Sequence, residues 1–512
     1  MSGLAKSTIN ITDSSKVANN GKKGIACFLG VTERGPVGTP TLVGSWLEYQ
    51  RTFGGLVSGN DFPLYCKRAL DSGSTLYISR VAHYTTISDS STLTGTKAVA
   101  TVSTVDFFKA KNIGTWGNNL TVTVAAMTGD SSKRTVTIKL AGYSAFDQVI
   151  DGITGVLTAD DIAKFNASAQ YVDLVLAVGA TLTSATYTLS GGAATGSVVD
   201  ADYTGDAGAG TGVYAFNVVK GAWYLAAPDK AVNAIDVALV NYCAARKDIV
   251  AYIRTPVGLT KTGCVQYRTA VSPYAGTAID SFYGRMWTGG LKIIDPLTSI
   301  SKNITEIADV LALTAVKDNA GNAWDSVSGN KNGHIQNATD VVYNFGSPAL
   351  ESDTVELVAN GINPVINHSS FGIVAWGNRS LLKDQTKLLS YAHVVDLVLG
   401  LYRFCKPILD NKLFEPNDIP TWKEIFLAIR PELERLVNER ALYKDSKIPG
   451  WEYMGDQYVD SLADLKVNNI DDVMAGKYKA FIRLYPINKL DYIELGLDIQ
   501  SASSATIEVL NA

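Results

Sequence analysis

The sequence is poor in the residues that build reactive centres. Its 512 residues include only four histidines, and none stands at a metal-ligand spacing to another histidine or to a cysteine. No GxxxxGK[ST] phosphate loop and no G-x-S-x-G nucleophile turn occurs. We therefore predict no catalytic residues, no cofactor and no metal site, and a protein that is not an enzyme.

Cysteine is also scarce, and its number is odd. An odd count of widely spaced cysteines does not fit a closed disulfide framework, so we expect buried free thiols. The alternative is a disulfide between subunits. The five positions are Cys27, Cys66, Cys243, Cys264 and Cys405.

Charge is sparse and evenly balanced. Charged residues make up 18% of the chain, and the net charge is -4. No basic stripe or polybasic segment is present, which argues against direct nucleic-acid binding and against an anionic membrane surface. The first residues lack the apolar segment of a secretory signal, and Asp396 interrupts the most apolar helical candidate. We expect no membrane insertion and assembly in a cytoplasm.

Glutamate is absent between Glu48 and Glu306, and much of this span is rich in Thr, Ser, Ala and Gly. Period-two runs within residues 88–217 indicate an inserted, mostly β domain. Lys133-Arg134 and Gly191-Gly192 are expected to form turns, and 158–165 a helix. The strand candidates are 99–105, 120–125, 135–140, 171–177 and 185–189.

Strand and helix signals stand out most clearly near the start of the chain. The apolar run Ile25–Val31 predicts a buried strand that ends at an exposed charged turn, 33–36. Ser45 is a candidate N-cap for a helix that ends at Gly54-Gly55. Leu64–Leu70 predicts a second helix. Residues 77–81 alternate as a strand that would pair beside the first.

The same alternation of helix and strand continues after residue 222. A helix over 231–245 is followed by a buried strand at 249–253, and Met286–Ile294 predicts one further strand. Near the end, a long helix over 388–409 precedes a second one capped by Thr421, which Pro431 should break or kink. The last strands are expected at 478–485 and 492–499.

Three of these motifs occur in the order typical of one protein family. GVTERGPV, the helix pattern [TS]-W-x-E-[YF]-x-x-x-FG and the strand pattern [IV]-x-R-V resemble the start of contractile tail sheath proteins of bacteriophages and related injection machines. APDKAVNAIDVALVNYCAARKD, FGIVAWGNRSLL and AFIRLYPINKLDYIELGLDI are similar to later parts of that family. The insertion is not covered by the resemblance.

The resemblance implies a structural subunit that polymerises helically around a tail tube, in stacked and expectedly hexameric rings. Contraction would drive the tube through a target cell envelope. Implied partners are further copies of the chain, the tube protein, and baseplate and tail terminator proteins. The expected location is the virion tail, assembled in the host cytoplasm.

The predicted fold class is a multidomain α/β protein with an α+β C-terminal domain. Neighbouring subunits would complete the C-terminal sheet with their terminal strands. The expected parts are an N-terminal arm (1–20), a core in two pieces (21–87 and 218–384), the inserted outer domain (88–217), a tube-facing domain (385–499) and a C-terminal arm (500–512).

At both ends of the chain, polar and apolar residues alternate as in a β-strand, at 7–12 and 505–510, and polar segments that could act as flexible tethers connect these stretches to the rest. A terminal strand can fold back on its own subunit or add to a neighbour's sheet edge, and the resemblance favours the second. The residues predicted to take part in strand exchange are Ser7, Ile9, Ile11, Phe481, Arg483, Tyr485, Ile493, Leu495, Leu497, Ile507 and Val509.

A mixed-charge helical face follows Thr421. Its simplest interpretation is a solvated surface with i,i+4 ion pairs. The resemblance implies instead a contact with the tube, for which the candidates are Lys423, Arg430, Arg435 and Arg440. A rival function is a secreted surface-layer or adhesin-like protein, suggested by the β-rich insertion and the low charge. An enzyme with an unrecognised site is a second rival, supported only by the α/β pattern.

Overall fold

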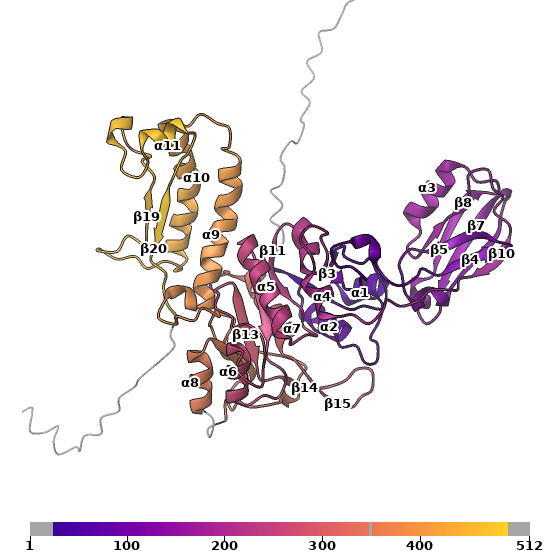
Figure 1. The fold of residues 1–512 in the computed structure, drawn as a ribbon, viewed down its shortest axis with the longest axis horizontal. Helices are drawn as coiled ribbons and strands as arrows, with labels where there is room; N and C mark the ends of the chain where they lie inside the picture. The colour runs from indigo at the N-terminus through magenta and orange to yellow at the C-terminus, as the bar shows by residue number, and fades with distance from the viewer. Residues whose placement is uncertain (1–23, 348–350, 490–512) are drawn as a thin grey trace, which may run out of the picture. The chain divides into compact units, whose positions relative to one another are not determined.

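The computed structural model describes residues 24–347 and 351–489 (Figure 1). They form a mixed α/β protein with five β-sheets, consistent with the predicted multidomain fold class. The chain divides into two compact units, and the boundary lies between Arg403 and Phe404. No helix in the described ranges is long and apolar enough to cross a membrane.

The first unit is built on an eight-stranded sheet. The six inner strands are parallel, and the strand at each edge is antiparallel to its neighbour. In spatial order the strands are β18 (Gly372–Ala375), β17 (Ile362–His368), β13 (Gly284–Thr288), β12 (Val250–Arg254), β11 (Ala222–Ala226), β1 (Ile25–Gly30), β3 (Leu76–Arg80) and β2 (Thr41–Val43).

Both faces of this sheet are buried, and alternate residues of each inner strand are assigned to opposite faces. Phe28 and Tyr252 belong to one hydrophobic cluster, whereas their neighbours Leu29 and Ile253 belong to the other. A parallel sheet covered on both faces requires apolar side chains at successive positions. The apolar runs that predicted strands at 25–31 and 249–253 are therefore confirmed.

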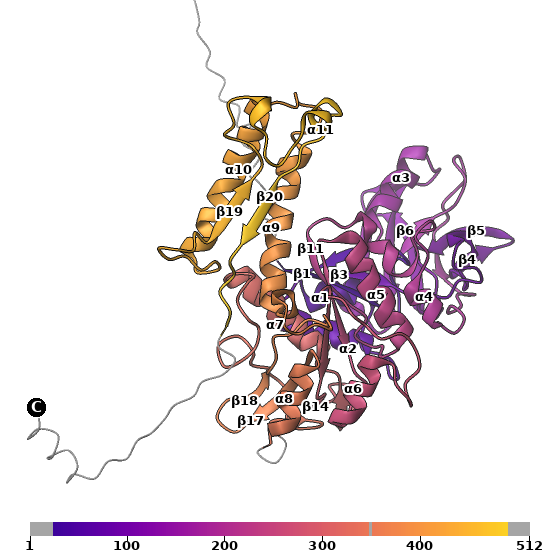
Figure 2. The same cartoon turned by 60° about the vertical axis from the view of Figure 1, so that its left-hand side comes forward.

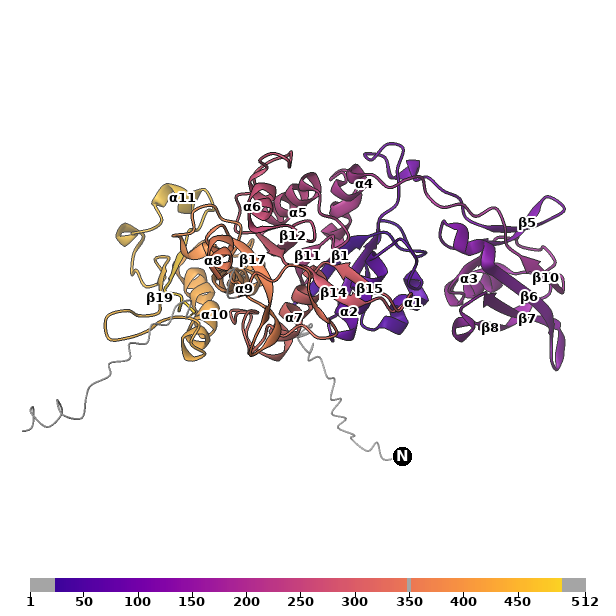
Figure 3. The ribbon, with the colours of Figure 1, turned by 90° about the horizontal axis from the view of Figure 1, so that it is seen from below.

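Helices cover the two faces in separate groups. Figure 3 shows α5 and α6 on one side of the strands and α2 and α7 on the other. The helices of this unit that pack around the sheet are α1 (Trp46–Phe53), α2 (Phe62–Asp71), α4 (Asp200–Thr204), α5 (Asn233–Arg246), α6 (Lys261–Thr269), α7 (Ile307–Ala320) and α8 (Glu351–Ala359).

The predicted single strand Met286–Ile294 is wrong, because two strands of different sheets occupy it. Gly289 and Gly290 adopt φ values of 121° and 66°, which only glycine adopts readily, and the chain turns between the strands. The second strand belongs to a small antiparallel sheet of β15 (Ser301–Ile304), β14 (Leu291–Ile294) and β16 (Asp340–Val341).

Residues 96–193, called here the β-rich region, have a hydrophobic cluster of their own. On β6, Leu120, Val122 and Val124 are buried, while the intervening threonines point away from the cluster. One sheet consists of β10 (Ala185–Thr188), β6 (Leu120–Met127), β7 (Asp130–Leu140) and β8 (Gln148–Thr154). The other consists of β4 (Val99–Val102), β5 (Val105–Ala110) and β9 (Val172–Leu174), and α3 (Ala159–Ser168) packs beside them.

Most strands predicted in this region are confirmed, and three local predictions are wrong. Gly191-Gly192 is not a turn, because the bridges Ser190–Val99 and Ala193–Thr96 on either side keep the chain antiparallel to 96–99. The expected single strand 99–105 is a hairpin, because Ser103 and Thr104 adopt positive φ and reverse the chain. Lys133-Arg134 is not a turn but lies within β7, which pairs with β6 and β8 on its two sides. The turn is at Gly129, whose φ is 90°.

The second unit contains two helices, a short third helix and a two-stranded sheet. Figure 2 shows β19 and β20 beside α10. Pro431 does not end α10, since Ile429, Leu433 and Leu436 form one continuous buried stripe across it. The N-cap is Asp418, which accepts from the Thr421 amide, and not Thr421 itself. The elements are α9 (Ala392–Asp410), which spans the unit boundary, α10 (Ile419–Asn438), β19 (Trp451–Met454), α11 (Ile470–Met474) and β20 (Phe481–Leu484).

The prediction of buried free thiols holds within this chain for four of the five cysteines, but the expected exposure of the turn at 33–36 is wrong. All five cysteines are free, and Cys405 alone is half-buried while the others are buried. Thr32 is 3% and Arg34 is 1% exposed, because this turn packs against aromatic rings of the β-rich region.

A buried carboxyl generates a prediction for stability. Asp236 on α5 is 2% exposed and accepts a 2.6 Å hydrogen bond from the Tyr267 hydroxyl. Burial raises the pKa of Asp236 to about 7. Between the unfolded value and about 7 the folded state holds the extra proton, so this group's stabilisation is present at low pH and is lost as pH rises.

We expect Asp236→Asn to remove this pH dependence while keeping an acceptor for Tyr267. From pH 5 to 7 the wild-type free energy of unfolding should fall, relative to the variant, by up to about 1.4 kcal/mol per pH unit. Urea denaturation at several pH values measures the difference. Asp147→Asn, at an exposed carboxylate, should leave the slope unchanged. Parallel curves for wild type and Asp236→Asn would contradict the prediction.

Candidate functional sites

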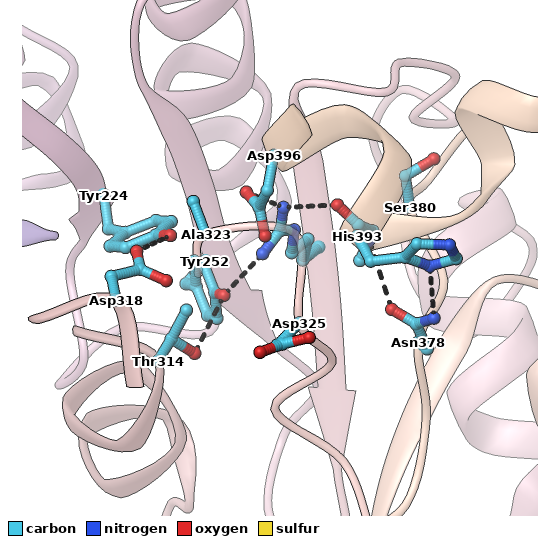
Figure 4. A network of polar contacts seen from close by, with 12 residues as sticks. Tyr224, Tyr252, Thr314, Asp318, Ala323, Asp325, Asn378, Ser380, His393 and Asp396 are labelled. Carbon is cyan, nitrogen blue, oxygen red and sulfur yellow. Dashed lines mark hydrogen bonds and ion pairs between the residues drawn. The ribbon is translucent and has the colours of Figure 1, made fainter. Parts of the chain in front are cut away.

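A buried polar cluster in the first unit lies where α9 begins. Arg285 on β13 donates to Asp396 on α9 at 2.5 Å and to the Tyr252 hydroxyl at 2.7 Å (Figure 4). It also donates to the Ala392 carbonyl at 3.0 Å. Arg285 is 2% exposed. Burial opposes its charge, but the Asp396 carboxylate and the Tyr252 hydroxyl outweigh burial and raise the pKa of Arg285.

Further polar groups extend this cluster toward α7. The Tyr224 hydroxyl donates to Asp318 (Figure 4). The Lys317 amine lies 2.8 Å from the other carboxylate oxygen of Asp318. Burial raises the pKa of Asp318 despite this neighbouring cation. Lys317 also donates to the carbonyls of Ala323 and Asp325 at 2.8 and 2.7 Å. The charges of Lys317 and Asp318 are therefore paired with each other, and both side chains have further hydrogen-bond partners.

The cluster holds a histidine but leaves no room for a substrate. The Nδ1 atom of His393 lies 2.7 Å from the Asn378 amide nitrogen. The cavity among these side chains has a volume of about 10 Å³. A volume of this size holds at most one water molecule. Its polar groups join the start of α9 to the strands and to the loop at Asn378, which is a structural role.

The two-stranded sheet of the second unit is the candidate assembly surface. Glu452 pairs with Arg483 and Met454 with Phe481 across the strands. On the other face, Tyr453 packs against Phe426 of α10 with ring centroids 5.0 Å apart. Within the described residues no third strand pairs with either edge. A two-stranded sheet is marginal by itself, and unpaired edges can accept a further strand.

The three predicted exchange residues that are described lie together on or next to β20. Phe481 is 57% exposed, and Arg483 donates to Glu452 at 2.7 Å. Tyr485 follows β20, and its hydroxyl donates to the same carboxylate at 2.8 Å. The other predicted exchange residues fall outside the described residues: Ser7, Ile9, Ile11, Ile493, Leu495, Leu497, Ile507 and Val509. The expected strand 492–499 and both arms fall outside as well.

The four tube-contact candidates divide into two kinds. Arg430 donates to Glu434, and Arg435 donates to Glu432 and Glu439, as the solvated-face interpretation expects. Lys423 on α10 and Arg440 beyond its end are exposed. Neither of these two forms an ion pair within 24–347 and 351–489. The charges of Lys423 and Arg440 are therefore more accessible to a partner than those of Arg430 and Arg435.

Sequence reasoning missed an apolar tip in the turn between α9 and α10. Leu409, Leu413 and Phe414 are all exposed, Phe414 completely. Phe414 adopts φ 71°, which is uncommon for a bulky residue. The run Lys412-Leu413-Phe414-Glu415-Pro416 was the available signal, because apolar residues beside a proline in a turn seldom find a core.

No family model matches the sequence, and no curated protein matches it. Solved structures do match its fold. A sheath tail protein from Listeria innocua is 15% identical, with a TM-score of 0.62, over 91% of this chain and 96% of that one. The helical sheath of the anti-feeding prophage in its contracted state is 14% identical, with a TM-score of 0.55, over 98% of this chain and 100% of that one.

A third likeness comes from an extracellular contractile injection system. The sheath complex of this system in its contracted state is 12% identical, with a TM-score of 0.56, over 98% of this chain and 99% of that one. The likeness at these identities concerns the fold. The chain therefore has the fold of contractile sheath proteins, and the resemblance seen in the sequence motifs is confirmed at that level.

The buried ion pair gives a second stability prediction. Arg285→Met leaves Asp396 buried without its cation, and we expect the free energy of unfolding to fall by about 3 to 5 kcal/mol. The double variant Arg285→Met/Asp396→Leu removes both charges and should recover most of the loss. Urea denaturation measures both changes.

The matched control is Lys67→Met, which breaks the Lys67–Asp71 pair on the surface of α2. Surface pairs contribute about 1 kcal/mol or less, so this variant should stay close to wild type. The account of the cluster is contradicted if Arg285→Met is no more destabilising than Lys67→Met, or if the double variant is less stable than Arg285→Met.

Proposed function

We propose that this chain is the structural subunit of a contractile sheath, which polymerises helically around a tail tube and shortens to drive the tube through a cell envelope. The observation that carries the proposal is the extent of the fold likeness, which spans nearly the whole of this chain and of subunits from contracted sheaths. A likeness confined to one domain would not distinguish a sheath from another α/β protein.

Assembly by strand exchange is the proposed way in which the subunits join. A helical polymer needs interfaces between two different surfaces of successive copies. The open edges of β19 and β20 offer one surface, and residues 7–12 and 505–510, with their alternating pattern, would supply strands from neighbours. The polar tethers would let the lattice rearrange while the strands stay paired.

We also propose the domain division and the partners that the motifs imply. The β-rich region has its own sheets and its own hydrophobic cluster, which supports an inserted domain within the predicted span 88–217, although Tyr203, Val213 and Phe216 near the end of that span pack on the large sheet. The proposed partners are further copies in hexameric rings, a tube protein, and baseplate and tail terminator proteins. Contraction needs no nucleotide if the contracted lattice has the lower free energy and a barrier holds the extended one. The proposed location is a virion tail or a related particle.

Electron microscopy of the purified chain tests this function against its rivals. We expect tubes or cogwheel rings in negative stain. A surface-layer protein would give planar arrays, and an enzyme would give single particles. Either result, at concentrations where the chain stays folded by circular dichroism, would contradict the sheath proposal.

Removing either terminal segment should abolish polymerisation. We expect chains lacking 1–15 or 503–512 to stay folded and monomeric, because each loses a strand that joins neighbours. Sedimentation velocity and negative-stain images measure the change. Replacing residues 501–504 with an equally long Gly/Ser segment keeps the tether and should leave tubes intact. Normal tubes from both deletions would rule out strand exchange.

Reversing the accessible charges should weaken binding to a tube. Lys423→Glu with Arg440→Glu should lower cosedimentation with purified tube protein at least tenfold at 0.15 M salt, and the effect should shrink at 1 M salt. Lys109→Glu with Lys164→Glu changes the net charge equally at exposed sites of the β-rich region and is the control. Equal cosedimentation of the two double variants would exclude these residues as the contact.

A further inference from the structure

The turn that carries the GVTERGPV motif lies inside a cage of aromatic rings. The guanidinium carbon of Arg34 lies 4.5 Å from the ring centroid of Tyr143, 5.4 Å from that of Tyr171 and 5.8 Å from that of Trp116. All three rings belong to the β-rich region, where they are far apart in the sequence. A cation facing several ring faces away from water is attracted by each of them.

The buried Arg34 guanidinium has few hydrogen-bond acceptors around it. Arg34 donates through Nη2 to the Gln50 carbonyl at 2.6 Å, and Glu33 lies 4.0 Å from Nη1. Within the described residues, Nε and Nη1 have no hydrogen-bond partner. A buried arginine is unfavourable unless its charge is compensated. The ring faces, together with Glu33, therefore compensate a charge that the Gln50 carbonyl only partly satisfies.

Glu33 extends the contact on the other side of the turn. Its carboxylate accepts from the Tyr143 hydroxyl at 2.9 Å and from the Gly55 amide at 3.2 Å. A Cβ at Gly54 would lie 2.2 Å from this carboxylate, and a Cβ at Gly55 would lie 2.7 Å from the Tyr143 hydroxyl. Gly54 and Gly55 therefore have a second role besides ending α1. Because they lack side chains, they leave room for the Glu33 carboxylate and the Tyr143 hydroxyl.

Two further hydrogen bonds cross the same boundary. Arg80, at the end of β3, donates to the carbonyls of Gly35 and Ile113 at 2.9 and 3.1 Å, so one side chain ties the turn to the β-rich region. The Tyr171 hydroxyl donates to the Arg51 carbonyl at 3.1 Å. On the side of the large sheet, all of the contacts named above come from the segment 33–80.

Besides these contacts, the guanidinium carbon of Arg51 lies 5.9 Å from the ring centroid of Phe146, and two chain segments join the β-rich region to the large sheet. These run beside each other, with Thr96 paired to Ala193 and the Gly196 amide donating to Thr94. Two neighbouring connections leave rotation about their common axis open. A third attachment removes that freedom.

We propose that the Glu33-Arg34 turn, gripped by Trp116, Tyr143 and Tyr171, is a clamp that fixes the β-rich region on the large sheet so that the two move as one body. Any exposed surface of the β-rich region then moves together with the large sheet when the sheet changes position. The clamp concerns a single chain, so its test is independent of the sheath proposal.

Distance measurement in the full-length chain tests the clamp. Spin labels are placed at Asp71→Cys on α2 and Lys164→Cys on α3, both exposed, in a Cys405→Ser background in which the remaining cysteines are buried. The unmodified turn should give a narrow distance distribution. Arg34→Ala should at least double its width, and Arg34→Lys should fall between the two because it keeps charge without the planar fork.

Arg134→Ala is the matched control. Arg134 lies within β7 and donates to carbonyls of the β-rich region itself, at Leu182, Ser131 and Lys133. Its loss should leave the width unchanged. An unchanged width in folded Arg34→Ala, or equal broadening in Arg134→Ala, overturns the proposal.

A milder variant decides the question if Arg34→Ala does not fold. Tyr143→Phe keeps the ring and removes only the hydroxyl that donates to Glu33. We expect a measurable broadening, while Tyr187→Phe, whose hydroxyl bonds Thr183 inside the β-rich region, should cause none. A Tyr143→Phe distribution as narrow as that of Tyr187→Phe overturns the clamp.

Discussion

Burial of both faces of the large parallel sheet is the constraint on which the rest of the structure depends. Each inner strand must be apolar at successive positions, and helices must cover both sides. Any charge that enters this interior must bring a partner, because an unpaired buried ion is strongly unfavourable. Arg285 meets Asp396 for this reason, and the pair joins the start of α9 to the middle of the sheet. The polar cluster is thus a consequence of the sheet's burial.

The sequence predicts those parts of the fold in which local chemistry decides the outcome. The apolar run of β1, the N-cap at Ser45 and the alternation of β6 each depend on neighbouring residues, and each is confirmed. The errors occur where distant residues decide. Glu33 and Arg34 look like a solvent-exposed turn until three rings more than 80 residues away along the chain surround them. Pro431 signals an interruption, but the stripe on either side of it holds α10 together.

The assembly surface shows a similar division. Phe481 and Arg483 alternate visibly in the sequence, and the structure places them on a sheet with unpaired edges in the part of the chain that it describes. On α10, by contrast, both the charges and their pairing could be predicted from sequence. Arg430 and Arg435 satisfy acidic residues one turn away, while Lys423 and Arg440 do not. Helical spacing already separates the two kinds, because Arg430 and Arg435 have glutamates three or four residues away, whereas Lys423 and Arg440 have no acidic residue at those positions.

A cryo-electron microscopy reconstruction of the polymer formed by the full-length chain tests the central claim most directly. The account predicts a helical tube in which residues 505–510 of one subunit form a strand along the edge of β19 or β20 in another. A planar array, or a tube in which these edges are occupied only by the subunit's own chain, would contradict it.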